Sequence, residues 1–160
     1  MKSKYLVYTL EKGKFECNDK TEFMFLTLHR DPKEGPAYTS FYENGKVKSQ
    51  EYWFNRKKHN EDGPATIKYY DNGNKKVEEW LIYGCLSRKS GPALTTYFST
   101  GSKESEHWWI NDQRHRVDGP AAIYYNQDGS IKDSRYMLNY KEVSKEYFDR
   151  NILKEKMNIL

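Results

Sequence analysis

The sequence predicts an all-β, solenoid-like array of antiparallel β-hairpin repeats, capped by a short C-terminal α-helix. The main observation is the tripeptide Gly-Pro-Ala, which occurs four times with a spacing of 28 residues, starting at Gly35, Gly63, Gly91 and Gly119. A fixed period of this size is typical of repeat architectures, whose copies are too small to bury a core alone and stack on their neighbours. Composition agrees with a half-solvated sheet, since 31% of the 160 residues are charged and 16% are aromatic.

Each repeat begins with an outgoing strand. After Gly-Pro-Ala, β-branched and aromatic residues alternate with others, and an aromatic residue recurs at one register: Phe41, Tyr69, Tyr97 and Tyr125. The segment then meets a glycine-containing turn, as at Asn44-Gly45. Asn-Gly supplies the positive φ angles of a two-residue type I′ turn, so we expect a tight hairpin at this point.

The return strand carries two neighbouring rows of large, mostly apolar residues. One row is Tyr52, Trp80, Trp108 and Tyr136, and the other is Trp53, Leu81, Trp109 and Met137. Adjacent residues of a strand point to opposite faces, and only one face of a single sheet has to be buried. The second row therefore predicts either a two-sided core or an exposed binding surface.

A second tight turn follows the return strand, for example at Asn111-Asp112, and a short basic connector leads to the next Gly-Pro. We expect the glycine of each Gly-Pro to adopt a backbone angle that other residues cannot, and the proline to end the ladder of hydrogen bonds. Each repeat is thus predicted to be one long hairpin with a polar connector.

The two ends differ from the repeats, as capping units do. We interpret residues 1–34 as a degenerate N-terminal capping repeat, 35–143 as four 28-residue hairpin repeats of which the last is partial, and 144–160 as a C-terminal capping helix. At the N-terminus, residues 5–10 are expected to pair as a strand with residues 23–28.

The C-terminal pattern changes from strand to helix. Ser144 is the expected N-cap, and the apolar stripe of the helix consists of Tyr147, Phe148, Ile152, Leu153 and Met157. Such a helix would cover the open edge of the last repeat, where unpaired strand groups otherwise favour aggregation.

Two motifs resemble a known repeat family. They are Tyr-Tyr-x-Asn-Gly-x-x-Lys, at residues 69–76, and His-Arg-x-Asp-Gly-Pro-Ala, at residues 115–121. In these motifs the chain is similar to the MORN-like repeat superfamily, and more closely to its bacterial, phage and giant-virus variant. The resemblance covers roughly residues 29–150. It implies a repeat fold, and family members are known or proposed as antitoxin-like proteins, membrane-associated scaffolds and viral proteins.

The sequence offers little for catalysis or for a cofactor. His59 and His115 share one repeat position, but repeats lie about 10 Å apart, too far for one metal ion to bridge them. Repeats display the same group many times, whereas catalysis needs different groups to converge. We therefore expect no enzyme, no metal and no organic cofactor. The distant Cys17 and Cys85 predict no disulfide, and the absence of a long apolar run predicts no membrane span, so we expect a cytoplasmic protein.

Binding to another protein through the repeat surface is the expected function, in an antitoxin-like, phage or viral inhibitor or in a scaffold. Long repeat surfaces contact macromolecules, and aromatic anchors with arginine at the rim are favoured at protein interfaces. The candidate partner-binding residues are Trp53, Leu81, Trp109, Met137, Tyr42, Tyr70, Phe98, Arg88, Arg114 and Arg116. The alternative is binding of single-stranded nucleic acid or an anionic surface by the aromatic and basic rows, for which a net charge of +4 is modest.

Overall fold

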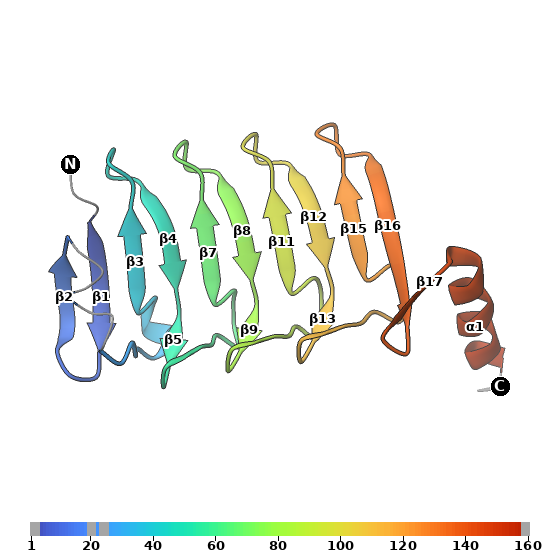
Figure 1. Cartoon of the computed structure of the whole chain (residues 1–160), viewed down its shortest axis with the longest axis horizontal. Coiled ribbons are helices and arrows are strands. Elements are labelled where there is room, and N and C mark those ends of the chain that lie inside the picture. The colour runs from blue at the N-terminus through green and yellow to red at the C-terminus, as the bar shows by residue number, and fades with distance from the viewer. Residues whose placement is uncertain (1–3, 19–21, 23–25, 158–160) are drawn as a thin grey trace.

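A computed structural model describes residues 4–18, 22 and 26–157 of the chain. The described part is mostly β-structure with one C-terminal helix. Eleven of its strands form one antiparallel sheet in the order β17-β16-β15-β12-β11-β8-β7-β4-β3-β1-β2. Figure 1 shows the hairpins side by side in a single row that ends at α1. The mostly β, antiparallel fold with a C-terminal helix is thus confirmed.

The strands of the large sheet are β1 (Tyr5–Thr9), β2 (Gly13–Cys17), β3 (Tyr38–Phe41), β4 (Val47–Glu51), β7 (Thr66–Tyr69), β8 (Lys75–Glu79), β11 (Leu94–Tyr97), β12 (Lys103–His107), β15 (Ala122–Tyr125), β16 (Ile131–Leu138) and β17 (Lys141–Val143). Three short hairpins lie beside it: β5 (Trp53–Phe54) with β6 (Lys57–Lys58), β9 (Leu81–Ile82) with β10 (Cys85–Leu86), and β13 (Trp109–Ile110) with β14 (Gln113–Arg114). A 3-10 turn covers Pro32–Glu34, and α1 covers Lys145–Met157.

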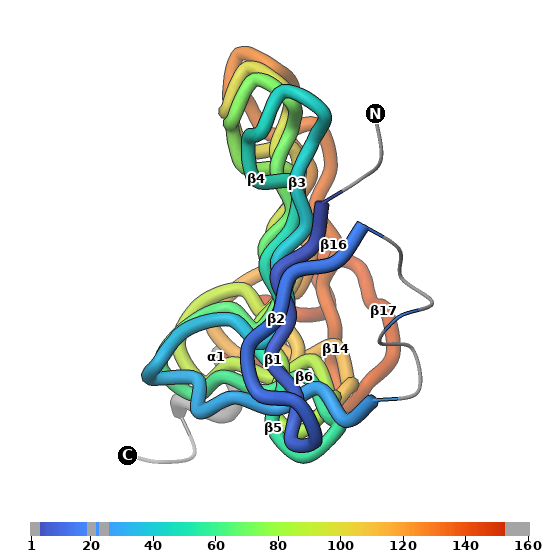
Figure 2. Tube along the Cα trace, turned by 90° about the vertical axis from the view of Figure 1, so that its left-hand side faces the viewer, coloured from blue at the N-terminus to red at the C-terminus, as the bar shows by residue number. Residues whose placement is uncertain are grey.

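The row of hairpins has a narrow part and a wide part. Figure 2, viewed along the row, shows the long hairpins overlying one another as a thin upright layer, while the connectors and short hairpins spread into a broader base. A single layer of strands has no second sheet to cover it. Side chains at the base and between neighbouring hairpins therefore supply most of the burial.

The turns of the long hairpins are not the expected two-residue type I′ turns. Gly45 has a φ of 80°, but Asn44 does not have a positive φ. The N–H of Gly45 donates to the carbonyl of Tyr42 at 2.9 Å, and the N–H of Tyr42 donates to the carbonyl of Lys46 at 2.8 Å. These bonds define a three-residue loop with a glycine bulge. Asn44 Oδ1 accepts a hydrogen bond from the N–H of Lys46 at 3.0 Å, so the asparagine stabilises the turn through its side chain.

The return strands are shorter than expected because a second hairpin uses their far end. After β4 ends at Glu51, β5 pairs with β6 around Asn55 and Arg56, whose φ angles are 48° and 64°. Two consecutive residues with positive φ are the mark of a type I′ turn. The two-residue turn therefore occurs at the second turn of the repeat, and in the first three repeats it closes a separate small hairpin, whereas in the last repeat β16 runs unbroken and pairs with β17.

The alanine of each Gly-Pro-Ala marks the crossing between repeats. Ala37, Ala65, Ala93 and Ala121 are fully buried. The carbonyl of Ala65 accepts from the N–H of Tyr52 at 2.8 Å, and that of Ala93 accepts from the N–H of Trp80 at 2.7 Å. Since this main-chain contact repeats at each junction, only a small side chain fits there.

In the described part of the N-terminus the expected pairing of residues 5–10 with residues 23–28 is found only at their far ends, where the N–H of Leu10 donates to the carbonyl of Thr27 at 3.1 Å. β1 pairs with β2 on one side and with β3 on the other. Gly13, with a φ of 65°, permits a tight return directly after Thr9. Within the described residues an isolated bridge joins Thr9 to Leu28, and residues 23–25 lie outside them. The N–H of Tyr8 donates to the carbonyl of Ala37 at 2.7 Å, so Tyr8 takes the place that Tyr52 has in the next repeat.

The C-terminal helix begins as expected. Ser144 Oγ accepts from the N–H of Tyr147 at 3.2 Å, which confirms the N-cap. Phe148 is buried and its ring lies 5.1 Å from that of Tyr136 on β16, whereas Tyr147 is about half exposed. Ile152 is half-buried, and the side chains of Leu153 and Met157 lie outside the described part. Phe148 therefore attaches the helix to the end of the sheet.

Candidate functional site

An arginine stacked on an aromatic ring recurs at the base of the array. Arg88 lies 3.7 Å above the ring centroid of Trp80, and Arg116 lies 4.0 Å above that of Trp108. Arg30 stacks in the same way on Tyr8 at 4.0 Å. Each Nη1 also donates to the carbonyl of the following Gly-Pro proline, at 3.2 to 3.3 Å. Arg88 and Arg116, which the sequence predicts at the rim of an interface, thus already have partners within the protein.

The stacked arginines explain the glycines of Gly-Pro-Ala. A Cβ on Gly91 would lie 3.0 Å from Arg88 Nη1, and one on Gly119 would lie 3.2 Å from Arg116 Cζ. Gly91 also has a φ of 105°, which confirms the unusual backbone angle expected at this position. For Gly63 and Gly119 that expectation is wrong, because neither has a positive φ. At these two positions glycine is needed for space. A Cβ on Gly63 would lie 3.1 Å from Asn60 Nδ2.

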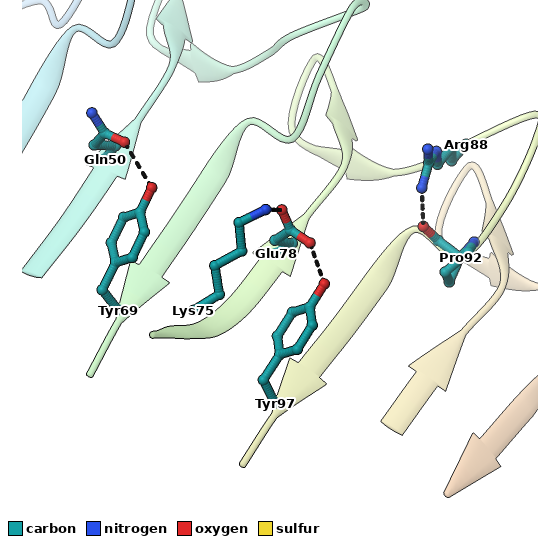
Figure 3. A network of polar contacts seen from close by, with 7 residues as sticks. All are labelled: Gln50, Tyr69, Lys75, Glu78, Arg88, Pro92 and Tyr97. Carbon is teal, nitrogen blue, oxygen red and sulfur yellow. Dashed lines mark hydrogen bonds and ion pairs between the residues drawn. The ribbon is translucent and has the colours of Figure 1, made fainter. Parts of the chain in front are cut away.

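A ladder of tyrosine hydroxyls joins neighbouring hairpins (Figure 3). Tyr97 donates to Glu78 Oε2, and Lys75 Nζ contacts the other oxygen of that carboxylate at 2.6 Å. Tyr125 donates to Glu106 at 2.6 Å. Burial and then the hydrogen bond to Glu106 raise the pKa of Tyr125 to about 12, so the phenol stays a neutral donor. These carboxylates connect one hairpin to the next.

A groove lined by tyrosine and lysine side chains runs along β3, β4 and β7, and we call it the tyrosine–lysine groove. Its volume is about 360 Å³, and its lining residues are Tyr5, Tyr38, Ser40, Phe41, Tyr42, Lys48, Ser49, Glu51, Lys68, Tyr69 and Lys76. Lys48 lies over the ring of Tyr42 at 5.5 Å, and Lys76 lies over that of Tyr70 at 5.3 Å. Lys48, Lys68 and Lys76 are exposed.

The charge of this groove is positive. The carboxylate of Glu51 already binds Trp53 Nε1 at 2.9 Å and Lys58 Nζ at 3.3 Å. The three exposed lysines therefore face a single carboxylate whose charge is already balanced. A surface of this kind attracts acidic groups.

The tyrosines at the upper end of the groove are held in place. Tyr42 Oη donates to the carbonyl of Tyr69 at 2.6 Å, and Tyr70 Oη donates to that of Tyr97 at 2.8 Å. Each hydroxyl thus anchors its ring to the next hairpin, and burial raises the pKa of Tyr42. Both rings stay half-buried, as does Phe98, which has no hydroxyl.

The second row of the return strands packs within the protein. Leu81 is buried, and Trp53, Trp109 and Met137 are half-buried. Trp53 packs against the buried cluster of Val7, Cys17 and Tyr38. Arg114 stacks on Trp109 at 5.0 Å. The row thus agrees with a sheet that is packed on both faces. Its half-exposed rings remain candidates for contact with a partner.

The connector histidines have structural partners. His29 Nδ1 accepts from the N–H of Asn55 at 3.2 Å, and His59 Nδ1 accepts from the N–H of Tyr83 at 3.4 Å. In the described part of the chain, no group of three or more His, Cys, Asp and Glu side chains is placed to hold a metal. Cys17 is buried and Cys85 half-buried, and neither forms a disulfide. Among these same residues no helix has the length and apolar character needed to cross a bilayer.

Sequence reasoning missed the three groove lysines. A signal exists, because Lys48 and Lys76 each follow a half-buried tyrosine by six residues across a turn. No protein-family model, no curated protein and no solved structure matches the chain. The candidate site therefore depends on its own geometry.

Proposed function

We propose that the protein is a non-enzymatic binding module, a solenoid-like repeat array that holds another protein in the tyrosine–lysine groove. The observation that carries the proposal is the pairing of a fixed tyrosine ring with an exposed lysine in two successive repeats, Tyr42 with Lys48 and Tyr70 with Lys76. Tyr42, Lys48 and Lys76 line the same groove of about 360 Å³, and Tyr70 adjoins it through Lys76.

The fixed rings favour tight contact with a protein. Tyrosine supplies a large contact area and is enriched at interface hot spots. Because hydrogen bonds to the next hairpin already hold Tyr42 and Tyr70, little side-chain entropy remains to be lost on binding. The lysines add charge complementarity, which selects an acidic segment of the partner. Trp53 donates to Glu51, which lines the groove, and its ring would extend the contact surface.

Single-stranded nucleic acid is the second candidate. Its support is the same pairing of rings with cations, since bases stack on aromatic side chains while lysines neutralise phosphates. The pattern covers only two repeats, however: Glu104 stands 28 residues after Lys76, and Phe98 stands 28 residues after Tyr70. A long strand would meet this acidic side chain in the next repeat, so the protein partner is favoured.

The resemblance to MORN-like repeats supplies the proposed biological setting. In that setting the partner is a host or toxin protein, and this chain acts as an antitoxin-like or viral inhibitor or as a scaffold. The architecture fits such a role because a row of repeats offers a long, fixed surface.

The test is affinity capture from the lysate of the natural host, followed by mass spectrometry. The groove variant is Lys48→Ala/Lys68→Ala/Lys76→Ala, and the matched control removes three exposed lysines elsewhere, Lys14, Lys132 and Lys141. The proposal expects one protein to be captured by the wild type and the control, to be lost from the groove variant, and to persist after nuclease treatment. Loss after nuclease treatment would favour the nucleic-acid candidate. Equal capture by all three forms would refute the groove as the site.

A further inference from the structure

Two pockets at the base of the array occupy the same place in successive repeats. The His59 pocket, of about 230 Å³, is lined by Asp31, Pro32, Lys33, Phe54, His59, Asn60, Glu61, Asp62 and Tyr83. The Ser87 pocket, of about 520 Å³, is lined by Glu61, Trp80, Ile82, Ser87, Arg88, Lys89, Ser90 and Asn111. Seven of the eight residues that line the Ser87 pocket stand 28 residues after a residue that lines the His59 pocket. The two pockets therefore occupy equivalent positions in the chain and differ in the side chains that line them.

In the first of these pockets the protein fills the space with its own rings. His59 stacks on Tyr83 with centroids 4.1 Å apart and an angle of 11° between the planes. The counterparts of these two residues are Ser87 and Asn111, which carry no ring. The space that two stacked rings fill in one repeat is therefore open in the next, and its volume lies in the range of ligand pockets. Ile82 supplies an apolar wall.

The charge of the lining also reverses. One lysine and three carboxylates line the His59 pocket, whereas Arg88, Lys89 and a single carboxylate, Glu61, line the Ser87 pocket. Glu61 Oε1 is 3.8 Å from Nε2 of His59, on the side of the neighbouring pocket. An anion is therefore favoured in the Ser87 pocket and disfavoured in the His59 pocket.

Arg88 lacks the carboxylate partner that Arg116 and Arg30 have. Nε of Arg116 contacts Oδ1 of Asp118 at 2.7 Å, and Nε of Arg30 lies 3.9 Å from Glu34. The counterpart of Asp118 is Ser90, and no ion pair of Arg88 occurs among the described residues. The guanidinium of Arg88 is fixed by its stack on Trp80 and by its hydrogen bond to the carbonyl of Pro92. It is therefore positioned to donate hydrogen bonds to a carboxylate.

We propose that the Ser87 pocket binds a small aromatic carboxylate. The ring of the ligand occupies the space that His59 and Tyr83 fill one repeat earlier, beside Ile82 and the Arg88 guanidinium. The carboxylate takes the position that Asp118 has on Arg116, where it binds Arg88 and lies close to Lys89. This site is separate from the tyrosine–lysine groove and shares no lining residue with it.

Indole-3-acetate is a suitable probe, and isothermal titration calorimetry with the full chain measures its binding. Its uncharged analogue indole-3-acetamide is the control for the carboxylate. We expect saturable 1:1 binding of indole-3-acetate and binding at least tenfold weaker for the amide. Ser90→Asp, which supplies Arg88 with an internal carboxylate, should weaken binding of the acid by at least tenfold.

The second variant, Ser87→His/Asn111→Tyr, rebuilds the ring pair of the preceding repeat and should abolish binding while the melting temperature stays at or above that of the wild type. Ser90→Asp changes one surface residue and keeps the test independent of how well the double variant folds. The proposal is wrong if the wild type shows no saturable binding at millimolar indole-3-acetate. It is also wrong if the amide binds equally well, or if Ser90→Asp binds as the wild type does.

Discussion

Gly119→Ala tests directly why the repeat contains its invariant glycine. Gly119 does not have a positive φ, so backbone strain does not demand glycine there. A Cβ at this position would lie 3.2 Å from Arg116 Cζ and 3.4 Å from its Nε. The added methyl group must therefore push the guanidinium aside by a few tenths of an ångström and disturb its stack on Trp108. If this explanation is right, alanine is harmful at residue 119 only while Arg116 is present.

The size of the effect follows from what the arginine loses. Its stack on Trp108 is worth about 1 kcal/mol at a partly buried site, and its charged hydrogen bond to the carbonyl of Pro120 about 1.5 kcal/mol. The ion pair with exposed Asp118 adds little. Arg116→Ala should thus lower the free energy of unfolding by about 2.5 kcal/mol. Because the arginine can swing away, Gly119→Ala can cost no more than that, and we expect about 1 to 2 kcal/mol.

Urea unfolding followed by tryptophan fluorescence measures both single variants and the double variant. In the Arg116→Ala background the cost of Gly119→Ala should disappear. Gly129→Ala is the control, because Gly129 has a φ of 86° with no heavy atom within 4 Å of an added Cβ. It should cost about 1 to 2 kcal/mol from backbone strain alone, whether or not Arg116 is present. The reasoning is refuted if Gly119→Ala costs the same with and without Arg116.

Three further predictions concern other parts of the array. Burial, and then nearby Arg114, lower the pKa of His107 in the folded protein. The stability that the neutral imidazole contributes is therefore complete above its unfolded pKa of about 6.5, and it is lost as pH falls through the lower pKa of the folded state. Urea midpoints of His107→Gln between pH 8 and 5 should therefore vary less with pH than those of the wild type. Tyr125→Phe removes a donor from Glu106 and should lower the free energy of unfolding by about 1 to 2 kcal/mol in the same assay. Phe148→Ala should release α1, seen as fast hydrogen exchange at residues 145–152 with no change in β7 and β8.

The antiparallel strands and their turns could be predicted because each strand depends on local alternation and each turn on a glycine or asparagine. The position of the type I′ turn could not, because Asn-Gly and Asn-Arg are both compatible with a hairpin turn. Hydrogen bonding across the hairpin selects the three-residue loop at Gly45 and the two-residue loop at Asn55. The pairing of β1 with β2 and β3 was missed because Tyr8 aligns with Tyr52 only after the residues of β2 are treated as an insertion.

The candidate site was only partly predictable for a similar reason. Aromatic anchors such as Tyr42 and Tyr70 follow from periodicity, whereas their lysine partners lie across a turn. Arg88 and Arg116 look like free rim residues in the sequence, because stacking on a ring eight residues away in the chain leaves no periodic signal of its own. Their role depends on the short hairpin between ring and arginine, which only the three-dimensional arrangement reveals.

The central claim is that a partner protein occupies the tyrosine–lysine groove. Lysine footprinting with an amine-reactive reagent, read by mass spectrometry with and without the captured partner, tests it most directly because Lys33, Lys48, Lys68, Lys76 and Lys89 are all exposed. The account predicts that the partner protects Lys48, Lys68 and Lys76 from modification and leaves Lys33 and Lys89, at the base of the array, as reactive as in the free protein. Protection of Lys33 and Lys89 with unchanged reactivity of the three groove lysines would contradict it.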